Sequence, residues 1–373
     1  MYRVRTRASY PAPVPAPLPR RPALGLRCAA APAGAEILEV APDVPAAALL
    51  RPGDRLLALD DDPIAGPAAI AAALRRRRAG DRLRVLFARD REIRAVELVL
   101  SDMPLETCPG AHVLHDSLEF RGVRLRTLVA RPRDAEPRAA WLLLPGIACA
   151  SQELAQAPAL RPILAALAAV GVVTMRVERP GLGDSEGGPC EALGFHDELA
   201  LFAAGLAALR THDFVDPRAL GLLGHSVGGM LAPLLADGVR TVAVSGTCAL
   251  PWPEVVLRSA RRHAARTGED LAVALARVRT GRAPQYTDEL AAIDLVAAWS
   301  RVTADVLVLH GERDAAVALA DARALAEQLA ARPGARTHFV ALPGADHDLR
   351  LEDGATSPLA CEALTRLARD APP

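Results

Sequence analysis

From about Met103 to residue 373, the sequence alternates between short apolar segments and segments rich in Ala and Leu. Strands that are buried on both faces of a parallel sheet read as nearly unbroken apolar runs, and the helices that connect them cover both faces. The alternation therefore predicts a mostly parallel α/β sheet. The expected strands are Leu118–Phe120, Val123–Val129, Ala140–Leu144, Val172–Val177, Leu220–Leu223, Thr241–Val244, Val306–Leu309 and Thr337–Leu342. The expected helices include Pro162–Val170, Glu198–Leu209, Met230–Ala236 and Ala320–Leu329.

The composition is that of a folded protein without a strong net charge. Of the 373 residues, 51% are hydrophobic and 24% are charged, which is enough apolar surface for a large core. The 44 basic and 44 acidic residues cancel, so the sequence offers no case for nucleic-acid binding. No apolar run reaches the roughly 20 residues of a membrane span. Every basic residue is Arg, which excludes Lys as a nucleophile or base.

The first 20 residues are expected to form a flexible tail, because they are rich in Pro and Ala and lack the apolar segment of a secretory signal. The six cysteines are scattered and contain no C-x-x-C pair, and a chain of this length needs no disulfide to fold. We therefore expect reduced thiols in a cytoplasmic protein. The cysteines are Cys28, Cys108, Cys149, Cys190, Cys248 and Cys361.

Residues 21–100 show a different pattern, with short strands around one helix. Strands are predicted over Glu36–Val40 and Arg55–Leu59, and two alternating segments around Asp90-Arg91 predict a hairpin. A helix is expected to begin at Pro67, which suits a first helical turn, and to run to about Arg78. Residues 1–100 carry 17 Arg against 11 acidic residues, and the remainder carries 27 against 33. This difference also indicates two modules.

The first module resembles a PDZ domain. The resemblance rests on Leu24-Gly25-Leu26, on Val40-Ala41-Pro42-Asp43-Val44-Pro45-Ala46-Ala47 and on Leu50-Arg51-Pro52-Gly53-Asp54 with the apolar strand that follows. It implies that the backbone N–H groups of Leu24, Gly25 and Leu26 hold the carboxylate of a C-terminal peptide, which adds to the sheet as a strand. The alternative is a module that binds no peptide and only packs against its neighbour, because Ala68 and Ala69 at the start of the groove helix offer no polar group.

The segment Gly224-His225-Ser226-Val227-Gly228-Gly229 lies between an expected strand and an expected helix. A G-x-S-x-G sequence in this position is typical of a nucleophile elbow, a turn so tight that side chains at 224 and 228 would collide with backbone. Such a turn exposes the hydroxyl of Ser226 above the sheet, and the helix N-terminus beneath favours developing negative charge. Ser226 is the candidate nucleophile. The alternative is a Gly-rich connection of no chemical meaning.

A nucleophilic Ser needs a base, and the base needs an acid that orients it. Asp314 follows the strand Val306–Leu309, and His347 follows Thr337–Leu342. Both lie just past the carboxyl end of a strand, as Ser226 does, which is where ligands bind in parallel α/β sheets. We interpret the three residues as a catalytic triad. Weaker candidates are Glu312 in the loop of the acid, Asp346 and Asp348 beside the base, and His225 inside the elbow.

The order Ser, Asp, His and the sequences His310-Gly311-Glu312-Arg313-Asp314 and Gly344-Ala345-Asp346-His347 resemble the α/β-hydrolase superfamily over residues 103–370. The resemblance implies the α/β-hydrolase fold, a mostly parallel sheet with helices on both faces and a small helical cap at about residues 248–301. A small PDZ-like β/α domain precedes it. We expect three parts: a tail at residues 1–20, the PDZ-like domain at 21–102 and the hydrolase domain at 103–373.

The resemblance also places the two oxyanion-binding N–H groups, at Val227 after the nucleophile and at Ile147 in the loop after Ala140–Leu144. This loop begins with Pro145-Gly146, where family members usually have His-Gly. Because a backbone group supplies the hydrogen bond, the change leaves the assignment in place. The cap contains Trp252, Tyr286 and Trp299, and its two Trp residues are either walls of an acyl pocket or packing residues.

No cofactor and no metal are expected. Residues 179–187 superficially resemble a phosphate-binding loop but lack its final spacing, and α/β hydrolases have a structural turn there. The resemblance implies a serine hydrolase that cleaves an ester or thioester of a small-molecule acyl substrate through an acyl-enzyme. Three alternatives remain open: a serine peptidase acting on C-terminal peptides, an acyltransferase, and a non-catalytic PDZ binding protein.

Overall fold

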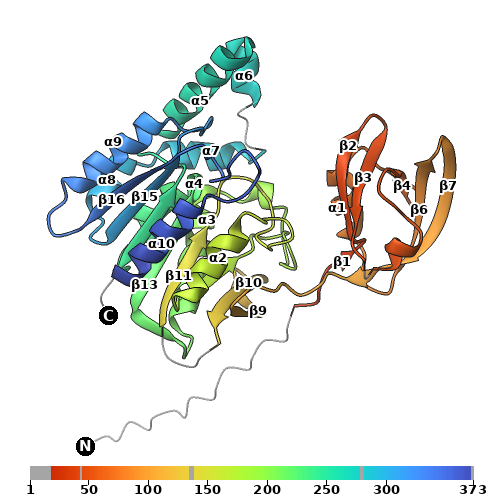
Figure 1. Ribbon diagram of the computed structural model, residues 1–373, viewed down its shortest axis with the longest axis horizontal. Helices are drawn as coiled ribbons and strands as arrows, with labels where there is room; N and C mark the ends of the chain where they lie inside the picture. The colour runs from red at the N-terminus through yellow and green to blue at the C-terminus, as the bar shows by residue number, and fades with distance from the viewer. Residues whose placement is uncertain (1–17, 43, 134–137, 278–280, 371–373) are drawn as a thin grey trace, which may run out of the picture. The chain divides into compact units, whose positions relative to one another are not determined.

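The computed structural model describes residues 18–42, 44–133, 138–277 and 281–370, which form two compact units (Figure 1). The first unit is Pro19–Thr107, and the second comprises residue 18 and the described residues from Cys108 onward. Residues 1–17 of the expected tail lie outside the described residues. No helix within the described ranges is long and apolar enough to cross a lipid bilayer.

The first unit is an antiparallel sheet with one α-helix. Its strands follow the order β2-β3-β4-β6-β7, which leaves β2 at one edge. The main strands are β2 (Leu26–Ala31), β3 (Gly34–Val40), β4 (Arg55–Leu59), β6 (Arg82–Arg89) and β7 (Glu92–Val99). The short strand β5 (Asp62–Pro63) pairs with β4, and β1 (Pro22–Ala23) pairs with β8 (Ser101–Asp102). The helical segments are η1 (Pro45–Ala48), a 3₁₀ turn, and α1 (Pro67–Leu74).

Two local expectations for this unit have different outcomes. The hairpin is confirmed: β6 pairs with β7, and Asp90 and Arg91 have φ values of 52° and 68°, as in the tight turns that match the twist of paired strands. The predicted end of the helix at about Arg78 was wrong, because α1 stops at Leu74. There the N–H groups of Arg76 and Arg77 bond to carbonyls three residues back, which tightens the backbone and closes the helix.

The second unit is built on an eight-stranded sheet in the order β16-β15-β14-β13-β11-β12-β10-β9. Its strands are β9 (Ala111–Phe120), β10 (Val123–Pro132), β11 (Arg138–Leu144), β12 (Val173–Val177), β13 (Val215–His225), β14 (Thr241–Ser245), β15 (Asp305–Gly311) and β16 (Thr337–Leu342). Strand β10 runs antiparallel to β9 and β12, and the other pairings are parallel. The predicted, mostly parallel sheet is confirmed, and β9 and β10 form an antiparallel hairpin at one edge of it.

Helices cover both faces of this sheet. On one face lie α2 (Leu160–Ala169) and α10 (Pro358–Asp370), which are side by side in front of the sheet in Figure 1. The other face is covered by α3 (Phe195–Arg210), α4 (Val227–Leu235) and α9 (Leu319–Ala330). Between β14 and β15 the chain forms α5 (Trp252–Thr267), α6 (Leu271–Arg277), α7 (Pro284–Ala291) and α8 (Leu295–Ser300). The segment after β12 contains a 3₁₀ turn, η2 (Cys190–Ala192).

The cysteines do not all have the expected state. Cys149, in the loop after β11, and Cys190, at the start of η2, form a disulfide across a sequence separation of 41. The expectation of six reduced thiols is therefore wrong for this pair. The spacing of the two residues contains no signal for the bond, because only the folded chain brings the β11 loop against η2. The other four are free thiols, namely Cys28, Cys108, Cys248 and Cys361.

Four loops leave the sheet at the carboxyl ends of parallel strands, after β11, β13, β15 and β16. Because neighbouring parallel strands end at the same edge of a sheet, these loops lie together. Each loop carries one of the predicted site residues. These residues are Ile147, Ser226, Asp314 and His347.

Candidate active site

Ser226 lies between β13 and α4 in a backbone conformation that residues with a side chain rarely adopt, with φ 55° and ψ −120°. A Cβ on Gly224 would lie 2.5 Å from the Gly228 carbonyl oxygen, and a Cβ on Gly228 would overlap the Leu144 carbonyl oxygen. The N–H of Ser226 donates to the carbonyl oxygen of Ser245 at 2.8 Å. The predicted strand–turn–helix setting of G-x-S-x-G is therefore present, and both glycines are required by close backbone approach.

His347 and Asp314 lie on the loops after β16 and β15, and their side chains are hydrogen-bonded. Nδ1 of His347 lies 2.8 Å from Oδ2 of Asp314, while Oδ1 of Asp314 accepts the N–H groups of Ala316 and Val317 at 2.8 and 2.9 Å. Burial is the largest single influence and raises the pKa of Asp314, but the hydrogen bond and charge interaction with His347, the N–H of Val317 and the charge interaction with His310 together hold that pKa below its usual value. Burial lowers the pKa of His347, but the hydrogen bond and charge of Asp314, together with the charges of Asp348 and Asp346, raise it above its usual value.

The weaker candidates take other positions. Nε2 of His225 lies 3.4 Å from Oδ1 of Asp348, and the ring centroids of His225 and His347 are 4.9 Å apart. Burial lowers the pKa of His225, which favours its neutral form. The side chain of Asp346 accepts a backbone N–H from four residues further on, and Glu312 is exposed. The ring of His347 is hydrogen-bonded to the carboxylate of Asp314, the acid predicted from the sequence, and not to Asp346 or Glu312.

Ser226 and His347 line one cavity of about 210 Å³. Its other lining residues come from the β11 loop, α4, the β14 loop, α5 and the β15 loop: Ile147, Val227, Met230, Gly246, Trp252, Val255, Val256, Ser259, Ala316 and Val317. Among the described residues that line the cavity, His347 is the only one with a titratable side chain, so the cavity suits an uncharged group. Among the cap aromatics Trp252 is a wall of the cavity, whereas Tyr286 and Trp299 are fully buried packing residues.

The two predicted oxyanion donors, Val227 and Ile147, both line this cavity. Val227 is the first residue of α4, where a backbone N–H has no acceptor within the helix. The N–H of Ile147 has no hydrogen-bond partner among the residues that the structure describes. A Cβ on Gly146 would lie 3.4 Å from the Cβ of Ser226, so the β11 loop lies directly against the predicted nucleophile.

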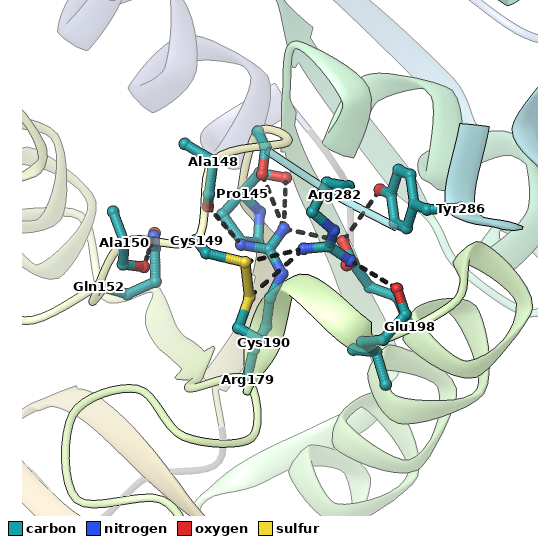
Figure 2. Close-up of a disulfide and its surroundings, with 12 residues drawn as sticks. Pro145, Ala148, Cys149, Ala150, Gln152, Arg179, Cys190, Glu198, Arg282 and Tyr286 are labelled. Carbon is teal, nitrogen blue, oxygen red and sulfur yellow. Dashed lines mark hydrogen bonds and ion pairs between the residues drawn. A yellow bond between two sulfur atoms is a disulfide. The ribbon is translucent and has the colours of Figure 1, made fainter. Parts of the chain in front are cut away.

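A buried polar cluster supports the β11 loop from the side of β12 and α3 (Figure 2). Arg179 follows β12 and donates to the carbonyl oxygens of Gly146 and Ala148 at 2.7 and 3.0 Å. It also pairs with the fully buried Glu198 of α3 at 2.8 Å. Arg282, just before α7, pairs with the same carboxylate and places Nη1 3.3 and 3.4 Å from the two disulfide sulfurs. We call these residues, with Cys149 and Cys190, the loop-support cluster.

The sequence indicated almost none of this cluster. Arg179 lies in the segment that was predicted to be a structural turn. The one feature that marks it in the sequence is its charge, close after an apolar strand. Glu198 lies in an expected helix and Arg282 in the expected cap, but nothing in their neighbourhood marks them as partners. Their pairing joins residues 84 positions apart, which only the tertiary structure brings together.

The predicted peptide-carboxylate loop of the first unit lies between β1 and β2. Leu24 is buried in the core of the unit, and Leu26 begins β2. Gly25 has φ 68°, and a Cβ there would lie 2.6 Å from the Val44 side chain, so this position requires Gly. Strand β2 is at the sheet edge, and α1 packs beside it. Among the described strands, β2 is therefore an edge strand, the kind of element to which a peptide can add.

Comparison with known proteins agrees with the fold of both units. The model of the alpha/beta hydrolase family matches residues 141–358, and the PDZ domain model matches residues 22–100. No curated protein matches the sequence.

Within the described residues, no group of three or more His, Cys, Asp or Glu side chains is arranged to hold a metal ion.

Solved structures share the fold of the second unit at low sequence identity. Est1E from Butyrivibrio proteoclasticus with ferulic acid bound is 21% identical, covers 68% of this chain and 96% of its own, and has a TM-score of 0.51. DcsB in complex with its substrate analogue is 17% identical, with 70% and 99% coverage and a TM-score of 0.53. The Pyrococcus furiosus esterase Pf2001 is 12% identical, with 69% and 91% coverage and a TM-score of 0.50. The chain therefore belongs to the alpha/beta hydrolase family and carries a PDZ domain at residues 22–100.

Proposed function

We propose that this chain is a serine hydrolase that cleaves esters or thioesters of uncharged acyl groups through an acyl-enzyme. One observation carries the proposal. Ser226, in a strained turn, lines the same cavity as His347, and Nδ1 of His347 is held by Asp314 at 2.8 Å. This supplies a nucleophile, a base and an orienting acid in one place.

In this mechanism Nε2 of His347 accepts the proton of the Ser226 hydroxyl as Oγ attacks the acyl carbon. The carbonyl oxygen becomes an oxyanion and accepts the N–H groups of Val227 and Ile147. His347 then gives its proton to the departing alcohol or thiol, which leaves the acyl group on Ser226. Water attacks the acyl-enzyme with His347 again as base, and the carboxylic acid leaves. Asp314 stabilises the imidazolium in both halves of the reaction.

The experiment is a panel of p-nitrophenyl esters, acyl thioesters and C-terminal peptides, tested on the wild type and on Ser226→Ala. Ser300→Ala, an exposed change at the end of α8, is the matched control. We expect ester or thioester turnover that Ser226→Ala abolishes, and fluorophosphonate labelling that only Ser226→Ala loses. Undiminished turnover in Ser226→Ala would falsify the mechanism.

The same panel distinguishes the alternatives raised by the sequence. Cleavage of C-terminal peptides with poor ester turnover supports the peptidase. New esters or amides formed when alcohols or amines are added support an acyltransferase. Folded protein that neither turns over any substrate nor reacts with the fluorophosphonate supports a non-catalytic PDZ binding protein.

We also propose that the first unit binds a C-terminal peptide along β2, with its carboxylate at the N–H groups of Leu24, Gly25 and Leu26. The edge position of β2 and the neighbouring α1 support this proposal. Fluorescence polarisation with a library of labelled peptides tests it, with the same peptides amidated at the C-terminus as controls. Binding must depend on the free carboxylate, and equal binding of the amidated peptides contradicts the proposal.

The cytoplasmic location expected from the sequence stays a prediction. The disulfide between Cys149 and Cys190 weighs against it, because structural disulfides persist mainly in oxidising compartments. Cell fractionation combined with alkylation of free thiols at lysis decides the question. A cytoplasmic protein with alkylated Cys149 and Cys190 supports the original expectation.

A further inference from the structure

The guanidinium of Arg179 contacts the peptide group that carries the predicted oxyanion donor. Nη2 of Arg179 donates to the carbonyl oxygen of Gly146 at 2.7 Å, and this carbonyl belongs to the same peptide group as the N–H of Ile147. The peptide bond between Gly146 and Ile147 is trans, since the one cis peptide bond among the described residues is Gly188–Pro189. In a planar trans peptide the C=O and N–H point in opposite directions. The N–H of Ile147 therefore points away from Arg179.

Several contacts hold the side chain of Arg179 in one position. The side chain is 1% exposed, and Nη1 donates to the Ala148 carbonyl oxygen at 3.0 Å while Nη2 pairs with Glu198 at 2.8 Å. Glu198 is held in turn by Arg282 and by the hydroxyl of Tyr286 at 3.4 Å. Such a buried guanidinium has little freedom to move, so the Gly146 carbonyl has a fixed donor.

The opposite side of this peptide faces the site. Ile147 lines the cavity together with Ser226, and its N–H has no partner among the described residues. A hydrogen bond from a cation to a carbonyl also polarises the whole amide, which strengthens its N–H as a donor. Arg179 thus has two effects on the same N–H: it sets its direction and raises its donor strength.

We propose that Arg179 is a positioning residue for the oxyanion hole, which acts by holding the Gly146–Ile147 peptide with its N–H directed at the reacting carbonyl oxygen. This inference rests on the proposed function. Without the guanidinium, the peptide gains the freedom to rotate and to turn its carbonyl oxygen toward the site, where it would repel an oxyanion. The loss appears mainly in the transition state, because the ground-state carbonyl carries little charge.

The first test compares Arg179→Lys and Arg179→Met with the wild type. Lys keeps the charge but cannot reach Gly146, Ala148 and Glu198 at once, and Met keeps only the volume. We expect kcat to fall about 10-fold in Arg179→Lys and about 100-fold in Arg179→Met, the latter at the lower end of the range for losing one oxyanion donor, while KM stays within about 2-fold. The affinity for an alkylboronic acid, whose adduct with Ser226 carries an oxyanion, should fall by the same factors. A fall in kcat with unchanged boronic acid affinity overturns the proposal.

The second test is a double-mutant cycle with Ile147→Pro, which removes the N–H itself, and with Ile147→Ala, which keeps it. If Arg179 acts through this N–H, Arg179→Lys has no further effect on kcat in the Ile147→Pro background. In the Ile147→Ala background it costs the full 10-fold. Independent, multiplicative effects with Ile147→Pro overturn the proposal. If Ile147→Pro does not fold, as judged by circular dichroism and Tm, the boronic acid series decides alone.

The outcome is separable from that of the proposed function. If Ser226→Ala abolishes turnover but Arg179→Met leaves kcat and boronic acid affinity unchanged, the serine mechanism stands and the role of Arg179 falls. If Ser226→Ala retains full turnover, the proposed function itself falls. Thermal unfolding of each Arg179 variant shows whether a loss of kcat comes with loss of the native fold.

Discussion

Nδ1 of His347 lies 2.8 Å from Oδ2 of Asp314, a carboxylate whose other oxygen accepts two backbone N–H groups. These N–H groups fix the carboxylate, so the direction of the imidazole ring follows from the β15 loop. The pair also contributes to the proton affinity of the base: burial lowers the pKa of His347, while the hydrogen bond and charge of Asp314, with the charges of Asp348 and Asp346, raise it above its usual value.

This pair predicts the pH dependence of turnover. The base must be neutral, so kcat/KM rises with pH through the pKa of His347, which lies above the usual value of about 6.5. Asp314→Asn removes the charge that raises this pKa. We expect the midpoint to move to lower pH and kcat to fall by about 10⁴-fold, as for the loss of a triad acid. A pH profile of p-nitrophenyl ester hydrolysis checks both, and an unmoved midpoint contradicts the assignment of Asp314.

Trp252 is expected to limit the length of the acyl group, because it is a wall of the cavity that Ser226 lines. Trp252→Ala lengthens the cavity, and each further buried methylene is worth about 0.8 kcal/mol, or about 4-fold in kcat/KM. The ratio of kcat/KM for octanoyl over butyryl esters should rise about 10-fold or more. Val296→Ala, an exposed change on α8, is the control and should leave the ratio as it is. A ratio that falls in Trp252→Ala assigns Trp252 to another part of the substrate.

The disulfide is expected to stabilise the second unit. Closing a loop across 41 positions removes chain entropy from the unfolded state, which corresponds to about 4 kcal/mol in the chain-entropy model. The double variant Cys149→Ser, Cys190→Ser should lose a free energy of unfolding of this order in guanidinium titrations. Cys361→Ser, a half-buried free thiol, is the control. Reduced wild type should resemble the double variant, and identical unfolding of reduced and oxidised protein would contradict the prediction.

Glu178, fully buried after β12, is expected to make the protein less stable at higher pH. Burial raises the pKa of its carboxyl to about 7, although hydrogen bonds from Ser151 and Gln152 act the other way. An unfolded Glu releases its proton near pH 4.3. Between about pH 4.3 and 7 the native state keeps a proton that the unfolded state has lost, so the free energy of unfolding falls as pH rises, by a few kcal/mol.

Glu178→Gln keeps an acceptor for Ser151 and Gln152 and cannot titrate, so this part of the pH dependence should disappear. Urea unfolding at pH 5 and pH 8 measures it as the difference between wild type and variant. Glu352→Gln, at an exposed side chain, should show the wild-type pH dependence. If Glu178→Gln also retains it, another group is responsible.

Local pattern was sufficient for most of the sheet of the second unit. Its strands are buried on both faces, and such strands stand out as apolar runs whatever their neighbours are. The first unit was less predictable. Its strand β2 (Leu26–Ala31) contains Arg, Cys and three Ala residues, lies at the edge of the sheet and shows no clear alternation of apolar and polar residues. The extent of α1 depended on turns formed by Arg76 and Arg77, which the helix pattern does not reveal.

By itself, the sequence determined the family, the two-module organisation and the candidate residues Ser226, Asp314 and His347, because each rests on a short motif or a local periodicity. Only the tertiary structure decided that Trp252 rather than Trp299 lines the cavity, that Cys149 pairs with Cys190, and that Arg179 holds the Gly146 carbonyl. The physical reason is that hydrogen bonds, disulfides and packing act over a few ångströms between segments distant in sequence. Their partners are set by how the strands and helices pack, and local periodicity contains no record of that.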